Sequence, residues 1–167
     1  MKLIVGVADL KISSRRDDEI VTFALGSCLG ITVYDLVAGV GGMVHVMLPN
    51  SSIDPGKAAV NPYMFVDTGV RALFLGSYEA GAQKGRLEVI AAGGACTSGS
   101  DQDDYFQIGR RNITVLRTLL WKNGILLKNS NLGGSDARTM SLQVATGLVT
   151  VRTHGTTEVL SNGGRRE

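Results

Sequence analysis

The residues of this sequence best suited to covalent chemistry are Cys28 and His45. A thiol of ordinary pKa is only a few per cent thiolate at neutral pH, and a neighbouring imidazole raises that fraction and can later protonate a departing amine. Gly26 and Ser27 precede the cysteine. A glycine-containing corner can expose main-chain N–H groups that bind the oxygen of a tetrahedral intermediate. The segment therefore has the parts of a nucleophile with an adjacent oxyanion hole.

A predicted β-hairpin would bring the thiol and the imidazole together. Residues 29–35 and 42–48 are apolar runs on either side of a short turn. If the turn is centred on residues 37–38, facing residues have numbers that sum to about 75, so that His45 lies opposite Gly30 and diagonal to the cysteine. Diagonal neighbours are ~7–8 Å apart at Cα, within reach of a leaning imidazole. A register one residue different would move the histidine to the other face.

Spacing alone leaves a second interpretation open for each residue. Cysteine is among the residues most often buried, and a lone histidine on an apolar strand is usually a core or surface residue with satisfied hydrogen bonds. Thr22, six positions before Cys28, is by the same reasoning a strand threonine with a paired hydroxyl. Signatures built on a single cysteine do not transfer between families, so a more specific match is needed.

Several short apolar runs, rich in β-branched residues, predict strands. They lie at residues 3–7, 20–25, 29–34, 43–48 and 87–92. Alternation of apolar and polar residues on either side of Thr146-Gly147 predicts a second hairpin with one solvated face.

Two segments have helical periodicity. Asn61 and Pro62 predict a helix start, and apolar residues then recur at helical spacing until Gly81. The second segment runs from about residue 105 to residue 123. Its arginines are expected to form a basic, solvated face: Arg110, Arg111 and Arg117. Strands and helices together predict an α+β domain built in layers.

The composition bounds the classes of function. A chain of 167 residues suits one compact domain, which we expect to span residues 1–160 with 161–167 as a flexible tail. Lys and Arg total 17 against 15 Asp and Glu, and the net charge of +2 argues against nucleic acid or a membrane surface as partner. No apolar run approaches the ~20 residues that span a bilayer, and the N-terminus is unlike a signal peptide. We expect a cytoplasmic protein without membrane insertion.

The sequence carries no motif for a metal or cofactor. The cysteines and histidines at 28, 45, 96 and 154 lack the paired spacing of a zinc site. No phosphate-binding glycine motif is present. We therefore expect no metal and no cofactor, and a domain of this size predicts free thiols at Cys28 and Cys96.

A set of blocks resembles the chemoreceptor glutamine deamidases, the CheD family. The segments "ALGSCLGI" at 24–31 and "MVHVMLP" at 43–49 are similar to the family's "GLGSC" and "HVMLP" signatures. Four further blocks follow in the family's order: "FVDTGV" at 65–70, "IAAGGA" at 90–95, "IGRRNI" at 108–113 and "LGGSDART" at 132–139. The resemblance covers nearly the whole chain.

The resemblance implies a site, an activity and a fold. In that family a catalytic cysteine, a histidine 17 positions later and a threonine six positions earlier form the site, and these positions are Cys28, His45 and Thr22 here. The implied reaction converts specific glutamine side chains of chemoreceptor cytoplasmic domains to glutamate through a cysteine thioester, with a glutamate methylesterase side activity. The implied fold is an α/β/β sandwich similar to the deamidating domain of the cytotoxic necrotizing factor toxins.

Glycine pairs are the candidates for loops that contact the substrate, although each taken singly is more often an ordinary turn. These pairs are Gly93-Gly94 and Gly133-Gly134. Two residues depart from the family pattern: Asn131 stands where an acidic residue is frequent, and Cys96 stands where a non-cysteine residue is common.

Two other classes of function stay open at this point. The chain could act mainly as a binding module for the CheC-type phosphatase that the resemblance implies as a partner. It could also be a general cysteine peptidase, which would cleave main-chain amides.

Overall fold

The computed structural model of the chain describes residues 1–96 and 106–161, and within them ten strands form two sheets of five. Sheet A has the order β1 (Lys2–Ile4), β3 (Glu19–Leu25), β8 (Arg138–Gln143), β9 (Leu148–Thr153), β10 (Thr156–Ser161). Sheet B has the order β2 (Asp9–Ser13), β5 (Val40–Val46), β4 (Leu29–Asp35), β6 (Glu88–Gly93), β7 (Leu127–Leu132). Only β1–β3 and β6–β7 pair in parallel among these strands; the others are antiparallel.

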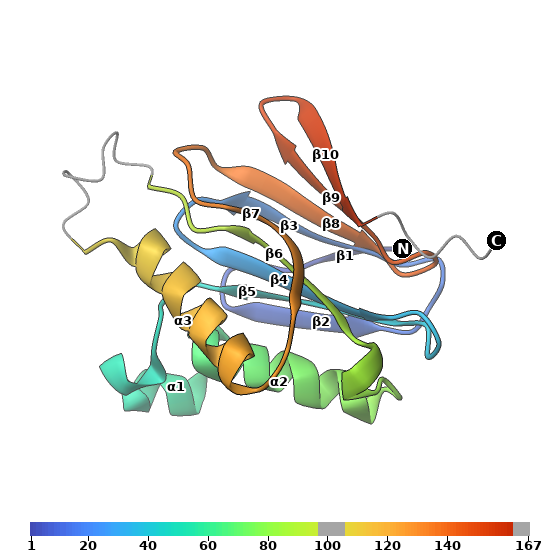
Figure 1. Cartoon of the computed structure of the whole chain (residues 1–167), viewed down its shortest axis with the longest axis horizontal. Coiled ribbons are helices and arrows are strands. Elements are labelled where there is room, and N and C mark those ends of the chain that lie inside the picture. The colour runs from blue at the N-terminus through green and yellow to red at the C-terminus, as the bar shows by residue number, and fades with distance from the viewer. Residues whose placement is uncertain (97–105, 162–167) are drawn as a thin grey trace.

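The two sheets and the helices form three layers. The helices α2 (Val66–Glu79) and α3 (Ile108–Lys122) lie on the face of sheet B that is turned away from sheet A (Figure 1). The short helix α1 (Pro55–Val60) is on the same side, where it contacts the 3₁₀ turns rather than the sheet and buries no residue. One apolar core fills the space between the sheets and a second fills the space between sheet B and the helices. Every residue of β4 and β5 is buried, because these strands are covered on both faces. The prediction of a layered α+β fold is confirmed.

The hairpin of β4 and β5 has the register that the sequence predicts. Gly30 pairs with His45, and Asp35 pairs with Val40 at the turn. The Asp35 carboxylate accepts the N–H groups of Val37 and Ala38, which closes the turn and fixes its length. Since turn length sets the register, this acidic residue helps to hold the histidine on the face turned toward sheet A.

A β-bulge interrupts β3. Thr22 pairs with Met140 and Leu25 pairs with Arg138, so that two residues of β3, at positions 23 and 24, oppose one residue of β8. In a regular strand, residues three apart point to opposite faces, yet Thr22 and Leu25 are both fully buried. The bulge absorbs the extra residue, so that both side chains enter the space between the sheets.

The segment predicted to form one helix from Asn61 to Gly81 begins differently. Pro62–Met64 forms a 3₁₀ turn, Phe65 is extended, and the α-helix starts only at Val66. Main-chain pairing explains the break, because the Met64 carbonyl accepts the N–H groups of the two residues that follow β5, and Phe65 bridges to Leu48.

Several elements are absent from the sequence prediction. They are the strands β2, β7 and β10, the short helix α1, and the 3₁₀ turns Ser51–Ile53 and Lys84–Arg86. The predicted start of the last helix near residue 105 lies outside the described residues, as do positions 162–167 of the predicted tail. Ser161 ends β10 and is buried. Among the described residues, no helix has the length and apolar character that crossing a bilayer demands.

Candidate active site

Cys28 stands at the mouth of the space between the two sheets. It precedes β4 by one residue, is partly exposed, and packs against the core between the sheets. Gly30 follows two residues later, and a Cβ added there would contact Leu25, Met140 and Thr22, all of sheet A. Residues two apart on a strand share a face, so the thiol and the side chain of His45, which pairs with Gly30, are on the same side of sheet B.

His45 and Thr22 are joined by a buried hydrogen bond between the sheets. Thr22 Oγ1 lies 2.7 Å from His45 Nδ1, and the two residues are 0% and 1% exposed. The threonine hydroxyl also donates to the carbonyl oxygen of Val5 at 2.8 Å. A hydroxyl has one proton, so the proton between Thr22 and His45 belongs to Nδ1, which donates to Oγ1. The imidazole is thereby fixed in the tautomer that leaves a lone pair on Nε2.

The remaining ring nitrogen is a buried acceptor without a donor. His45 Nε2 has no hydrogen-bond partner among the described residues. Burial lowers the pKa of His45, and burial raises the pKa of the Cys28 thiol. Both shifts favour a neutral thiol and a neutral imidazole in the resting protein.

The turn that leads into Cys28, residues 26–28, is held through its carbonyl groups. Gly26 O accepts the N–H of Ala95 at 2.8 Å, and Cys28 O accepts the N–H of Gly94 at 2.9 Å. The N–H of Gly26 is donated to Ala24 O. The N–H groups of Ser27 and Cys28 donate to no oxygen in the part of the chain that the structure describes. Of the N–H groups in the predicted oxyanion corner, these two are not bound to an oxygen of the described residues, and the Cys28 N–H interacts with the sulfur of its own side chain.

Gly93 and Gly94 lie directly against the turn of residues 26–28. Gly93 has φ +111°, and a Cβ on it would lie 2.1 Å from Cys28 O. Gly94 has φ +68°, and a Cβ on it would lie 2.6 Å from the Ile113 side chain of α3. Only glycine allows the end of β6 to pack this closely between the turn and the helix.

Sequence reasoning missed one buried polar residue at this site, Asn112 on α3. Its Nδ2 donates to Ser27 O and to Met47 O, each at 3.0 Å, and its Oδ1 is buried with no partner among the described residues. A signal was present in the sequence, because Asn112 lies one and two helical turns before Leu116 and Leu120 on the buried stripe. A polar residue at a core position of an amphipathic helix points to a specific partner.

The second glycine pair is held by Arg138. Its guanidinium donates to the carbonyl groups of Gly133 and Asn131 and to the Asn131 side-chain oxygen. Asn131 Nδ2 in turn donates to the carboxylate of Glu158. An acidic residue at position 131 could accept from the arginine but could not donate to the glutamate, so the amide suits this network.

A polar cavity of about 390 Å³ lies beside these glycine loops. Its lining includes Gly94, Gly133, Gly134 and Cys96, together with Arg110 and Arg117 of the exposed basic face of α3. Cys28 and Cys96 form no disulfide with each other. The structure thus brings both predicted glycine pairs to one end of the sandwich, the end at which the Cys28 turn lies.

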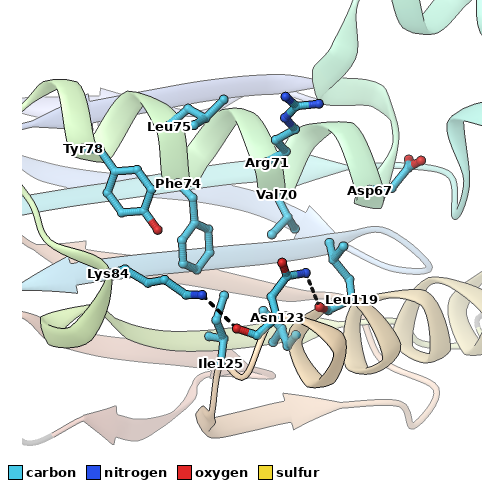
Figure 2. Close-up of a pocket in the computed structure, with 11 residues that line it drawn as sticks. Asp67, Val70, Arg71, Phe74, Leu75, Tyr78, Lys84, Leu119, Asn123 and Ile125 are labelled. Carbon is cyan, nitrogen blue, oxygen red and sulfur yellow. Dashed lines mark hydrogen bonds between the residues drawn. The ribbon is translucent and has the colours of Figure 1, made fainter.

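A separate cavity of about 320 Å³ lies between α2 and α3 on the outer side of sheet B. Figure 2 shows its mostly apolar wall, with Phe74 and Val70 of α2 facing Leu119 and Ile125. Lys84 Nζ donates to Asn123 O at its edge. None of the predicted site residues lines it.

No group of three or more His, Cys, Asp or Glu residues in the described part of the chain is arranged to hold a metal ion. His154 is on the surface, where its Nε2 lies 3.0 Å from the Asp136 carboxylate.

Known proteins resemble this chain along most of its length. Residues 47–153 match the family model described as CheD chemotactic sensory transduction. A probable chemoreceptor glutamine deamidase CheD of Solibacter usitatus is 44% identical, over 92% of this chain and 90% of the relative. A relative of the same description from Syntrophus aciditrophicus is 42% identical, over 92% and 94% of the two chains, and one from Thermococcus kodakarensis is 37% identical, over 91% and 92%. The chain belongs to the CheD family.

Proposed function

We propose that this protein is a protein-glutamine deamidase that acts on chemoreceptors, with Cys28 as nucleophile and His45 as general base and acid. The relatives are named for this activity. The observation that carries the assignment of roles is the hydrogen bond between Thr22 Oγ1 and His45 Nδ1. It leaves Nε2 as a buried acceptor on the face of sheet B that also carries the thiol.

The first half of the reaction forms a thioester. The Cys28 proton moves to His45 Nε2 as Sγ attacks the side-chain carboxamide carbon of a receptor glutamine. The N–H groups of Ser27 and Cys28 bind the oxygen that becomes negative in the tetrahedral intermediate. Collapse of this intermediate breaks the C–N bond, and the imidazolium gives its proton to the departing ammonia.

The second half of the reaction hydrolyses the thioester and regenerates the free enzyme. His45, again neutral, takes a proton from water as the water oxygen attacks the thioester carbon. The C–S bond then breaks, the imidazolium returns its proton to the departing sulfur, and the products are glutamate and the Cys28 thiol. A thioester route also accepts glutamate methyl esters, because methanol leaves more readily than ammonia. We therefore propose a receptor methylesterase side activity at the same site.

The role of Thr22 is to hold the imidazole in place. Its hydroxyl links Nδ1 to the Val5 carbonyl, which is the orienting role of the third member of a catalytic triad. For Gly93 and Gly94 we propose support of the nucleophile turn, because the N–H of Gly94 is already donated to Cys28 O. The polar cavity between the glycine loops and α3 is our candidate for the receptor segment next to the glutamine.

Two finer expectations stay predictions: a cytoplasmic location with a CheC-type phosphatase as protein partner, and similarity to the deamidating domain of the cytotoxic necrotizing factor toxins. The first concerns regulation, and co-purification of the two proteins would test it. The second concerns the fold, and a superposition of the two sandwiches would test it.

The activity is tested by incubating the protein with a receptor cytoplasmic fragment and measuring the intact mass of the fragment. Wild type should produce the small mass increase that replacement of NH₂ by OH gives. Cys28→Ala and His45→Ala should abolish it, whereas Cys96→Ala, which removes the other thiol, should retain it. Conversion by Cys28→Ala at the wild-type rate would end the assignment of the nucleophile. Cleavage of the receptor fragment into shorter peptides, in place of the small mass increase, would identify a peptidase.

A further inference from the structure

Asn112 connects helix α3 to both strands of the site. Its side chain is 0% exposed, and the two N–H bonds of its amide point to two carbonyl oxygens, Ser27 O and Met47 O. Ser27 precedes the proposed nucleophile directly, and Met47 follows His45 by two residues. One side chain thus joins the turn that carries the thiol to the end of the strand that carries the imidazole.

The orientation of this amide is fixed by its partners. Both neighbours are acceptors, so the NH₂ group must face them, and a flipped amide would place Oδ1 against two carbonyl oxygens. The cost of this arrangement is that Oδ1 is buried without a partner among the described residues. An unsatisfied buried oxygen destabilises a fold, so the contribution of Asn112 to stability does not by itself explain an asparagine here.

Because the peptide bond is planar, the hydrogen bond from Asn112 to Ser27 O also fixes the direction of the Cys28 N–H. The Ser27 carbonyl and the Cys28 N–H belong to one peptide unit, and the structure contains no cis peptide bond among its described residues. In a trans peptide the two groups point in opposite directions. Holding Ser27 O toward α3 therefore aims the Cys28 N–H away from α3. In the same way, the Ala95 N–H holds Gly26 O, so the Ser27 N–H of that peptide unit points away from Ala95.

We propose that Asn112 is a positioning residue of the deamidation reaction: it fixes the peptide between Ser27 and Cys28 so that the Cys28 N–H can bind the developing oxyanion. This inference rests on the proposed function. It assigns to Asn112 an effect on acyl transfer, which needs an oxyanion hole, and none on direct alkylation of the thiol, which does not.

Two variants test the proposal in a Cys96→Ser background, in which Cys28 is the only thiol. Asn112→Ala removes the amide, and Asn112→Leu removes it while keeping the side-chain volume, so one of the two remains informative if the other folds poorly. For each, kcat and KM for a receptor fragment are measured by mass spectrometry, and the rate of Cys28 alkylation by iodoacetamide is measured separately. Ser77→Ala, which removes another buried polar group, from α2, is the matched control.

The expected result is a fall in kcat of at least about tenfold for both Asn112 variants, with KM and the alkylation rate within about twofold of the Cys96→Ser parent. Ser77→Ala should lower the melting temperature and leave kcat unchanged. An unchanged kcat in a folded Asn112 variant would overturn the proposal, and so would a parallel fall of kcat and alkylation, which indicates general collapse of the site. Failure of the deamidase assignment itself is distinguishable, since the Cys96→Ser parent and the wild type would then give no mass shift with the receptor fragment.

Discussion

Thr22 of sheet A and His45 of sheet B meet between the two sheets, with Oγ1 and Nδ1 2.7 Å apart. Cys28, the nucleophile that we propose, is carried by sheet B, next to β4. Thr22, which fixes the tautomer of His45, and Cys28, which we propose that His45 activates, therefore belong to different layers. The chemistry depends on how sheet A packs on sheet B, and the glycine opposite the histidine, Gly30, leaves the room for that packing.

Removing the hydroxyl of Thr22 tests this relationship. Thr22→Val keeps the shape of the side chain but leaves the Nδ1–H of His45 without its acceptor, which favours the tautomer with the proton on Nε2. We expect kcat/KM for receptor deamidation to fall by about 10–100-fold, less than for loss of a carboxylate in a triad because a neutral hydroxyl gives weaker support. Thr22→Ser is the control, since it retains the hydroxyl, and equal rates for the two variants would contradict the role.

The pH dependence should report the burial of the imidazole. Burial lowers the pKa of His45 below its ordinary value of 6.5, so the base stays neutral, and active, into more acidic solution than a free imidazole would. The acid limb of kcat/KM against pH is expected below pH 6.5. The same shift means that the stability contributed by neutral His45 is present above pH 6.5 and is lost as the pH falls through its pKa in the folded protein.

The thiol gives the complementary measurement. Burial raises the pKa of Cys28 above 9.0, so alkylation of Cys28 by iodoacetamide, in a Cys96→Ser background, should rise with pH through a midpoint above that value. If the resting site were a thiolate–imidazolium pair, the midpoint of Cys28 alkylation would lie well below pH 9.0, and the acid limb of kcat/KM would not be shifted below pH 6.5.

The part of the site that the sequence could predict is the part set by local geometry. The turn after β4 has one length, and turn length fixes which residues face each other, so the pairing of Gly30 with His45 followed from counting. The buried face and the solvated face of β8 and β9 could be predicted because apolar and polar residues alternate along both strands. Family resemblance supplied the role of Thr22, which spacing alone could not distinguish from an ordinary strand threonine.

The missed parts are set by contacts between distant segments. Strand β7, Leu127–Leu132, is rich in Asn, Ser and Lys, which are poor strand formers, and it is extended because it pairs with β6. Asn112 finds its two acceptors 85 and 65 residues away along the chain. The bulge in β3 is equally hidden, because "TFAL" contains no glycine to mark it.

Adding a methyl group to Gly93 should damage both stability and activity. Its φ of +111° is strained for any other residue, and the new Cβ would lie 2.1 Å from Cys28 O, so the nucleophile turn would have to move. Gly93→Ala is expected to lower the free energy of unfolding by at least about 2 kcal/mol. Gly85→Ala is the control, because nothing lies within 4 Å of its added Cβ. Urea denaturation measures both, and equal values would show that the end of β6 adapts freely.

Ala24 provides the opposite test, a substitution that should stabilise the protein. It lies in the β3 bulge with φ +55°, a left-handed conformation that costs alanine about 1–2 kcal/mol, and its side chain is exposed. Glycine adopts this conformation without that penalty but loses about 0.5–1 kcal/mol more in conformational entropy on folding. Ala24→Gly should therefore raise the free energy of unfolding by about 0.5 kcal/mol.

Ala72→Gly, in the middle of α2, should lower the free energy of unfolding by about 0.5–1 kcal/mol, since no strain is relieved there. The opposite signs of the two Ala→Gly changes are the diagnostic result in parallel urea denaturation curves. If Ala24→Gly destabilises the protein as Ala72→Gly does, the left-handed bulge is not strained.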